Sequence, residues 1–308
     1  MRKRPVNVPK ELPVFLFFAA LCGALALATR AFASASNLKV LGSDAAAIGI
    51  MAVGMTAVII TGGIDLSVAA ILSLSALIGG AVIARGETAL GCAMALSVGA
   101  GCGLANGLLI TRAGMPPIIA TLGTLYILQS GATLLSSGQC IILEPNRLAF
   151  LGSGFGPLAL MLAVFAVGAF VMRFTRAGRH VYAIGGNEES ARLAGISPRR
   201  VKIGVYAVSG LLSALAGLVM LAIGSTFQAN DAAGYELAVI AAVVIGGTSI
   251  TGGQGSIIGT LIGVGISTVL RNGAVLVGLE ARWAQAVVGA AIFAAVAVDR
   301  LRRRGEGS

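Results

Sequence analysis

Long apolar stretches make up most of this chain, and charged residues separate them at wide intervals. A bilayer core about 30 Å thick takes roughly 20 apolar residues as one helix, and most of the uncharged stretches are near that length. They cover residues 12–29, 45–64, 66–84, 88–111, 113–143, 148–172, 203–230, 237–270 and 283–298. The pattern predicts membrane-spanning helices along the whole chain.

The longest uncharged stretch, 237–270, would be about 50 Å long as a single helix, which is too long for one crossing. The glycine-rich run GGTSITGGQG at 246–255 interrupts it, so we expect two spans around a bend. The predicted fold is therefore all-α: a polytopic integral membrane protein with broken glycine-rich segments. Ten spans are predicted, at 12–29, 44–61, 66–84, 89–111, 116–137, 157–173, 202–224, 236–250, 255–271 and 282–299.

Composition and charge agree with a membrane location. Only 11% of the 308 residues are charged, against about 25% in soluble domains. With ten spans and both termini in the cytosol, 16 of the 22 Lys and Arg lie on the cytosolic side, as the positive-inside rule requires. The net charge of +10 thus indicates orientation in a lipid membrane, and we expect no nucleic-acid partner. We expect residues 1–308 to form one transmembrane domain, with 174–201 as a cytoplasmic loop.

Glycine spacing indicates where helices approach closely. Glycines recur at every fourth position in two predicted spans, and such small-residue faces let helix backbones pack together in lipid. They are Gly99, Gly103, Gly107, Gly255, Gly259 and Gly263. Residues 57–80 and 241–265 also share an order of apolar helix, Gly-Gly break, polar residues and small-residue helix, which resembles the internal repeats of transporters.

Asp65 in TGGIDLS is the most informative acidic residue. It lies between uncharged stretches of 20 and 19 residues, and an ionisable group at membrane depth is costly and often functional. The Gly62-Gly63 break beside it frees backbone groups to line a cavity. Alternatively, Asp65 is the N-cap of the helix at 66–84. The two roles are compatible.

Further polar residues lie within or beside the spans. Each could simply hydrogen-bond to a neighbouring helix, or together they could line a polar path for a hydroxylated solute and gate it with Asp65. The set comprises Ser67, Asn106, Thr121, Thr124 and Gln129.

Catalytic signatures are missing from the sequence. It contains no Walker A motif, so we expect no nucleotide site. His180, the only histidine, stands in a charged loop, which excludes a zinc protease motif and a Ser-His triad. The four cysteines form no CxxC pair. We expect no metal, no cofactor and no catalytic residue.

The charged island GGNEESARLAGISPRR at 185–200 predicts a short, capped helix at 188–194. Asn187 is the expected N-cap, Glu188 and Glu189 complement the helix dipole, and Gly195 is the expected residue after the last turn. Ser197-Pro198 then predicts the start of the next helix. An ordinary loop that obeys the positive-inside rule is the simpler interpretation, but two caps favour a rigid docking element for an external motor.

Four stretches resemble the permease subunits of bacterial ABC sugar importers of the ribose-permease type. They are GMTAVIITGGIDLSVAAILSLSA (54–76), NGLLITRAGMPPIIATLGTL (106–125), TRAGRHVYAIGGNEESARLAGISPRRVKIGVYAVSGLLSALAGLV (175–219) and GYELAVIAAVVIGGTSITGGQGSIIGTLIG (234–263). They span nearly the whole chain in order. Two departures, Gln129 where relatives commonly have Arg and Ala238 where they have Asp, leave the identity of the sugar open.

The resemblance implies a location in the bacterial inner membrane and several partners. These are a second permease, either an identical copy or a paralogue, two copies of a nucleotide-binding ATPase subunit, and a periplasmic sugar-binding protein. It also implies that the central loop contacts the ATPase. The residues concerned are Asn187, Glu188, Glu189, Ala191, Arg192, Ala194, Gly195 and Ile196.

The expected function is therefore transport of a monosaccharide, a ribose-like pentose or a hexose, through a subunit that hydrolyses no ATP itself. A permease for another small solute, such as a furanosyl signal molecule, is an alternative. A proton-coupled secondary transporter would use Asp65 as its proton carrier. An intramembrane enzyme would need a second buried catalytic group near Asp65, and the sequence offers none.

Overall fold

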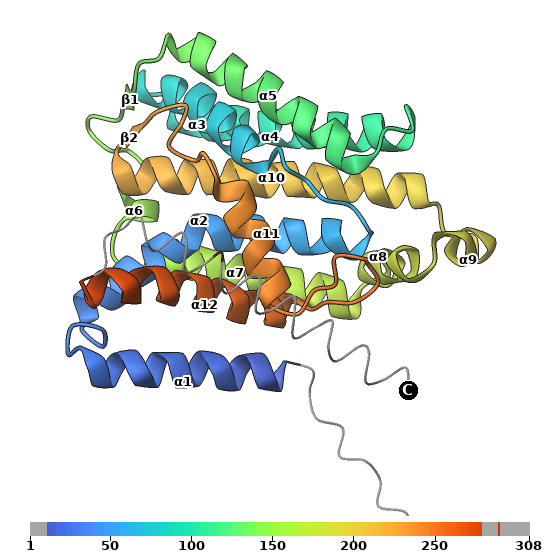
Figure 1. Ribbon diagram of the computed structural model, residues 1–308. Coiled ribbons are helices and arrows are strands. Elements are labelled where there is room, and N and C mark those ends of the chain that lie inside the picture. The colour runs from blue at the N-terminus through green and yellow to red at the C-terminus, as the bar shows by residue number, and fades with distance from the viewer. Residues whose placement is uncertain (1–10, 279–288, 290–308) are drawn as a thin grey trace, which may run out of the picture.

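The computed structural model describes residues 11–278 and residue 289, and it is almost entirely helical (Figure 1). The helices are α1 (Leu12–Ala28), α2 (Ala35–Ile60), α3 (Val68–Ala84), α4 (Thr88–Thr111), α5 (Pro117–Ser136), α6 (Ala149–Gly152), α7 (Gly156–Phe174), α8 (Arg176–Gly186), α9 (Glu188–Leu193), α10 (Pro198–Gly224), α11 (Tyr235–Ile245) and α12 (Ile257–Leu276). Two short strands, β1 (Ile141–Ile142) and β2 (Thr226–Phe227), pair in antiparallel register.

The all-α prediction is confirmed, and nine of the ten predicted spans coincide with described helices. Six of these helices are long and apolar enough to cross a membrane: α2, α4, α5, α7, α10 and α12. Three more, α1, α3 and α11, are apolar but only 11 to 17 residues long. The tenth predicted span, 282–299, lies outside the described residues apart from residue 289.

Several predicted helix ends were wrong for identifiable reasons. Helix α2 begins nine residues before the predicted 44, because Ser34 caps it by accepting from the Asn37 N–H. Lys39 and Asp44 therefore lie inside α2. The predicted helix was too short because its start was taken from an uncharged stretch. Helix α11 ends at Ile245 instead of residue 250, because the chain turns at Gly246 and at Gly247, whose φ is +88°.

Helix α2 is the buried centre of the bundle, with 17 of its 26 residues buried. The close contact between α4 and α10 confirms the packing role of the first glycine series. A Cβ at Gly99 would meet the Gly210 carbonyl, one at Gly103 the Tyr206 carbonyl, and one at Gly107 the Ile203 backbone. In the second series, Gly259 and Gly263 pack against α11, whereas Gly255 meets Thr248 within the bend.

The two ends of the bundle differ (Figure 1). At one end lie α6 and the β1–β2 pair, in which Ile141 is opposite Phe227. At the other end lie α8, α9 and the bends that follow α2 and α11. The charged segment, predicted as a loop with one short helix at 188–194, contains two helices, α8 and α9. Helix α8 was not predicted, although Thr175 caps it and Val181 and Ile184 bury one face.

Candidate functional site

The bend between α2 and α3 holds a fully buried carboxylate, that of Asp65. Its Oδ1 accepts hydrogen bonds from the backbone N–H of Ser67 at 3.0 Å and from the Ser67 hydroxyl at 2.6 Å. Its Oδ2 accepts from the Ser209 hydroxyl of α10 at 3.1 Å. The bend begins where Gly62 turns with a φ of +78°. Asp65 is therefore fixed from its own bend and from a helix 144 residues away.

The hydrogen bonds continue from Ser67 into two further helices. Asn106 of α4 donates to the Ser67 Oγ at 2.8 Å and accepts from the Thr124 hydroxyl of α5 at 2.6 Å. Thr121 of α5 accepts from the backbone N–H of Leu66 at 3.1 Å. Five of the six residues predicted for a path or gate thus meet in one place, which we call the Asp65 network: Asp65, Ser67, Asn106, Thr121, Thr124 and the added Ser209.

The sixth predicted residue, Gln129, lies elsewhere. Its side-chain amide donates to the Ala229 carbonyl at 2.8 Å and to the Asn230 Oδ1 at 2.7 Å. Both acceptors belong to the segment between β2 and α11, at the end of the bundle that carries the strands. Gln129 therefore ties α5 to this connecting segment.

The Asp65 network is buried in this conformation except at Thr124, which is half-buried. Asp65, Ser67, Asn106 and Thr121 all have an exposed fraction of 0%. Among the described residues Asp65 has no ion-pair partner, and a buried charge without a cation is costly. Its carboxylate oxygens instead accept hydrogen bonds at the start of α3. Ser67 is the N-cap residue there, but its own side chain does not cap the helix. The prediction that Asp65 is the N-cap was wrong, because α3 begins at Val68 and Asp65 stands two residues before the N-cap Ser67, to which it is hydrogen-bonded.

Two residues of α10 escaped the prediction, Ser209 and Tyr206. The Tyr206 side chain is 1% exposed, and within the described part of the chain its hydroxyl has no hydrogen-bond partner. A Cβ added at Gly63 would meet this hydroxyl. The signal was available, since Tyr206 and Ser209 stand three residues apart in an apolar span and so share a helix face.

The second candidate region is the capped helix α9. The Asn187 Oδ1 accepts from the Ser190 N–H at 2.8 Å, which makes Asn187 the N-cap that the sequence predicted. Gly195 has a φ of +81°, and the Ile196 N–H reaches back to the Ala191 carbonyl at 3.0 Å. The helix ends at Leu193, one residue before the prediction.

Ion pairs strengthen this corner from both sides. Arg192 pairs with Glu189 at 2.6 Å, and Lys202 at the start of α10 pairs with Glu188 at 2.6 Å. The eight predicted coupling residues therefore form one compact unit, but its faces differ. Ala191 is 4% exposed, whereas Leu193 is 80% exposed and Ala194 is also exposed. Ala191 packs inward, whereas the other residues of α9 are exposed; Leu193 and the C-cap residue Ala194 form the apolar part of its outward edge.

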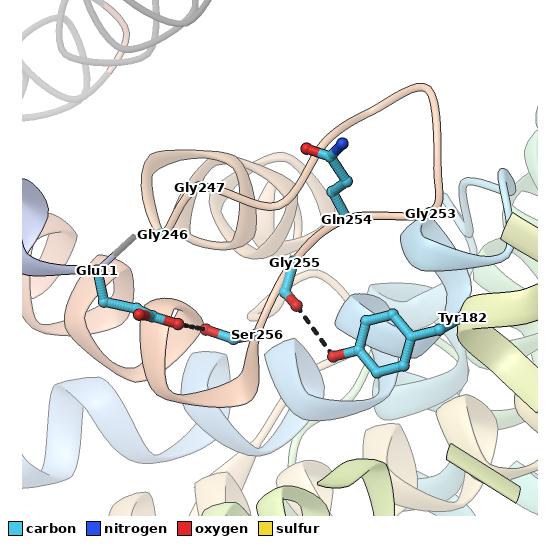
Figure 2. Close-up of a pocket in the computed structure, with 8 residues that line it drawn as sticks. All are labelled: Glu11, Tyr182, Gly246, Gly247, Gly253, Gln254, Gly255 and Ser256. Atoms are coloured by element: carbon cyan, nitrogen blue, oxygen red, sulfur yellow. Dashed lines mark hydrogen bonds between the residues drawn. The ribbon is translucent and has the colours of Figure 1, made fainter. Parts of the chain in front are cut away.

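A pocket of about 240 Å³ lies beside this corner (Figure 2). Four glycines of the α11–α12 bend form much of its wall, and Gln254 extends at its edge. The Tyr182 hydroxyl of α8 donates to the Gly255 carbonyl at 2.9 Å, and the Ser256 hydroxyl donates to the Glu11 carboxylate at 2.8 Å. No group of three or more metal-ligating side chains occurs within the described ranges.

Comparison with known proteins places the chain among transport proteins. Residues 37–296 match the family described as branched-chain amino acid transport system / permease component. The chain is 39% identical to the ribose import permease protein RbsC of Bacillus subtilis, over 96% of this chain and 94% of the relative. It is 39% identical to RbsC of Escherichia coli K12, over 82% of each chain.

A fructose import permease protein, FrcC of Rhizobium meliloti, is 35% identical over 96% of this chain and 86% of its own. No solved structure matches the chain. The apolar helices and these similarities agree, and the chain belongs to the permease family of the branched-chain amino acid transport system type.

Proposed function

We propose that this protein is the membrane permease subunit of an ATP-driven importer of a monosaccharide. The observation that carries the proposal is α9, a six-residue helix capped at both ends that presents an exposed leucine at one end of an apolar bundle. A solvated loop needs no such stiffness. The ribose and fructose import names of the relatives support a sugar as the solute, and the ABC transporter permease protein y4mJ supports an ATPase partner.

The ATPase subunit would contact the outward edge of α9. Leu193, with 80% of its side chain exposed, would fill an apolar groove of the ATPase, while Asn187 and Gly195 keep the helix short and stiff. ATP hydrolysis would take place wholly on that subunit. The end with α8 and α9 would then face the cytosol, together with both termini, and the β1–β2 end would receive sugar from a periplasmic binding protein.

A second permease copy would complete the path. Helix α5 carries hydroxyl side chains on an exposed face, where Tyr126 is 65% exposed and Ser130 and Thr133 are exposed as well. Polar side chains are unfavourable against lipid. We place this face toward the sugar and the second copy, with the buried Asp65 network holding the adjoining bend as a gate.

The other candidate functions have less support. A proton carrier must exchange protons with water on both sides of the membrane, whereas Asp65 is 0% exposed. The relatives are named as import permeases and as ABC transporter permeases.

The test is uptake of radiolabelled ribose and fructose by cells that produce the permease with its ATPase and binding protein. Uptake should persist when an uncoupler removes the proton gradient while ATP is maintained. Collapse of uptake under that condition would refute the proposal. Within the complex, Leu193→Arg should abolish co-purification of the ATPase. Ser153→Arg, which introduces the same charged side chain at an exposed site next to α6, should leave co-purification intact.

A further inference from the structure

One face of α8 contacts both broken segments of the bundle at once. A Cβ added to Gly185 would overlap the Ile60 carbonyl at the end of α2 and would lie 2.6 Å from the backbone nitrogen of Gly253. Gly185 is therefore packed between the bend that holds Asp65 and the bend between α11 and α12. These bends belong to the two segments that share an order of helix, Gly-Gly break and helix in the sequence.

The two bends are also bonded to each other at this point. The Gly253 N–H donates to the Ile60 carbonyl at 2.9 Å, so the last residue of α2 is tied directly to the α11–α12 bend. One turn before Gly185, the Tyr182 hydroxyl donates to the Gly255 carbonyl at 2.9 Å (Figure 2). Tyr182 and Gly185 share a face of α8 because they are three residues apart.

The consequence is a mechanical one. Any displacement of α8 toward the bundle pushes on Ile60 and Gly253 together, because no side chain lies between the three backbones. Ile60 stands five residues before Asp65, so the same displacement reaches the Asp65 network. Helix α8 is joined to α9 through Asn187 alone, which ends one helix and caps the other.

We infer that Tyr182 and Gly185 are the positioning residues that pass the movement of the ATPase-binding helix to both bends simultaneously. This inference rests on the proposed function. It assigns the transmission to α8, whereas α9 makes the contact with the partner. Tight backbone contact at Gly185 is the feature on which it depends.

The chain supplies a matched pair of substitutions. Gly186 is the next residue of the same helix, is exposed, and has no atom within 4 Å of its ideal Cβ. Gly185→Ala and Gly186→Ala thus make the same chemical change in the same helix, and neither glycine has a positive φ. In the complete complex, we expect Gly185→Ala to bind the ATPase normally but to lose at least tenfold in sugar-stimulated ATP hydrolysis and uptake. Gly186→Ala should stay within twofold of the parent protein on all three measurements.

Hydrogen exchange adds a readout that does not depend on transport. Vanadate trapping of the ATPase should change amide exchange at residues 57–66 and 246–256 of the parent complex, and Gly185→Ala should remove both changes. Full uptake by Gly185→Ala, or exchange changes like those of the parent, would overturn the inference. If Gly185→Ala fails to insert, Tyr182→Phe decides the matter, because it removes one hydroxyl without adding bulk. It should reduce uptake severalfold, and wild-type uptake would refute the inference.

The two proposals fail differently. A parent complex that imports no sugar refutes the proposed function. A parent complex that imports sugar, with Gly185→Ala and Tyr182→Phe equally active, refutes only the role of α8.

Discussion

The substitution Asp65→Asn removes the negative charge of Asp65 but leaves groups that can still form its hydrogen bonds, so it tests which of the two matters. In Asp65→Asn, the amide oxygen can keep the bond from the Ser67 backbone N–H, and the amide nitrogen can donate to Ser209, whose hydroxyl rotates to accept. No ion pair is lost, because Asp65 has none among the described residues. We therefore expect Asp65→Asn to change the free energy of unfolding by about 1 kcal/mol or less and to keep much of the uptake.

Asp65→Ala removes every acceptor. The hydroxyls of Ser67 and Ser209 can turn to other acceptors, but the Ser67 N–H stays buried and unpaired, which costs about 1–3 kcal/mol. The two hydroxyl bonds to the carboxylate, about 1.5–3 kcal/mol each, are largely regained when the hydroxyls turn, so the unpaired N–H dominates the loss. We expect a total loss of about 3 kcal/mol and little uptake.

The measurements are thermal unfolding of the detergent-purified protein and sugar uptake normalised to the amount in the membrane. The expected order of stability is parent and Asp65→Asn together, with Asp65→Ala several degrees lower. If Asp65→Asn unfolds like the parent and is present at normal levels but transports nothing, then the charge itself gates transport, and the hydrogen-bond account is refuted.

Three further predictions use other parts of the bundle. Native Cys140 is exposed and should react with a membrane-impermeant thiol reagent in intact cells. Arg199→Cys, made in a Cys140→Ser background, should react only after the cells are permeabilised. Labelling of Arg199→Cys from outside would contradict the proposed orientation. Gly103→Leu should prevent stable insertion, because its Cβ meets the Tyr206 carbonyl, whereas Gly101→Leu, with nothing within 4 Å, should accumulate normally on a membrane-fraction immunoblot. Gly195→Val should lower the stability of the α9 end by about 1 kcal/mol or more, because Gly195 has a left-handed backbone conformation. The permease should still insert at normal levels but lose sugar-stimulated ATP hydrolysis. Normal hydrolysis would show that α9 is not the coupling element.

The helices could be predicted because bilayer thickness fixes their length and lipid excludes charge. The same rule failed at α2, where Lys39 and Asp44 lie inside the helix. It also missed α8, because Arg176, Arg179 and His180 in its first half made the segment look like a loop, although Val181 and Ile184 are buried.

The candidate site was predictable residue by residue but not as an assembly. A polar side chain in an apolar span is conspicuous, which identified Asp65, Asn106 and Thr124. Their mutual contacts depend on how α3, α4, α5 and α10 pack. No local sequence pattern predicts a hydrogen bond between Asp65 and Ser209, which are 144 residues apart. Helical spacing alone likewise does not say which side of α9 meets the bundle, and the structure shows that Ala191 packs inward.

The two bends are held by different kinds of contact, and this difference indicates which of them moves. Side chains from α4, α5 and α10 fix the bend at Asp65: Asn106 donates to Ser67, Thr121 accepts from the Leu66 N–H, and Ser209 donates to Asp65, at 2.8–3.1 Å. The α11–α12 bend is held largely by backbone contacts, such as Gly253 to Ile60, and Gly252, Gly253 and Gly255 all have a positive φ.

Displacing the first bend would break several buried hydrogen bonds together, each worth about 1 kcal/mol or more. Displacing the second strains the side-chain bonds at its end, from Tyr182 to Gly255 and from Ser256 to Glu11, but the bend itself turns at glycines that tolerate many backbone conformations. The pocket beside it also provides open space next to Gly246 and Gly253. A push from α8 should therefore reach both bends and move the α11–α12 bend further than the bend at Asp65.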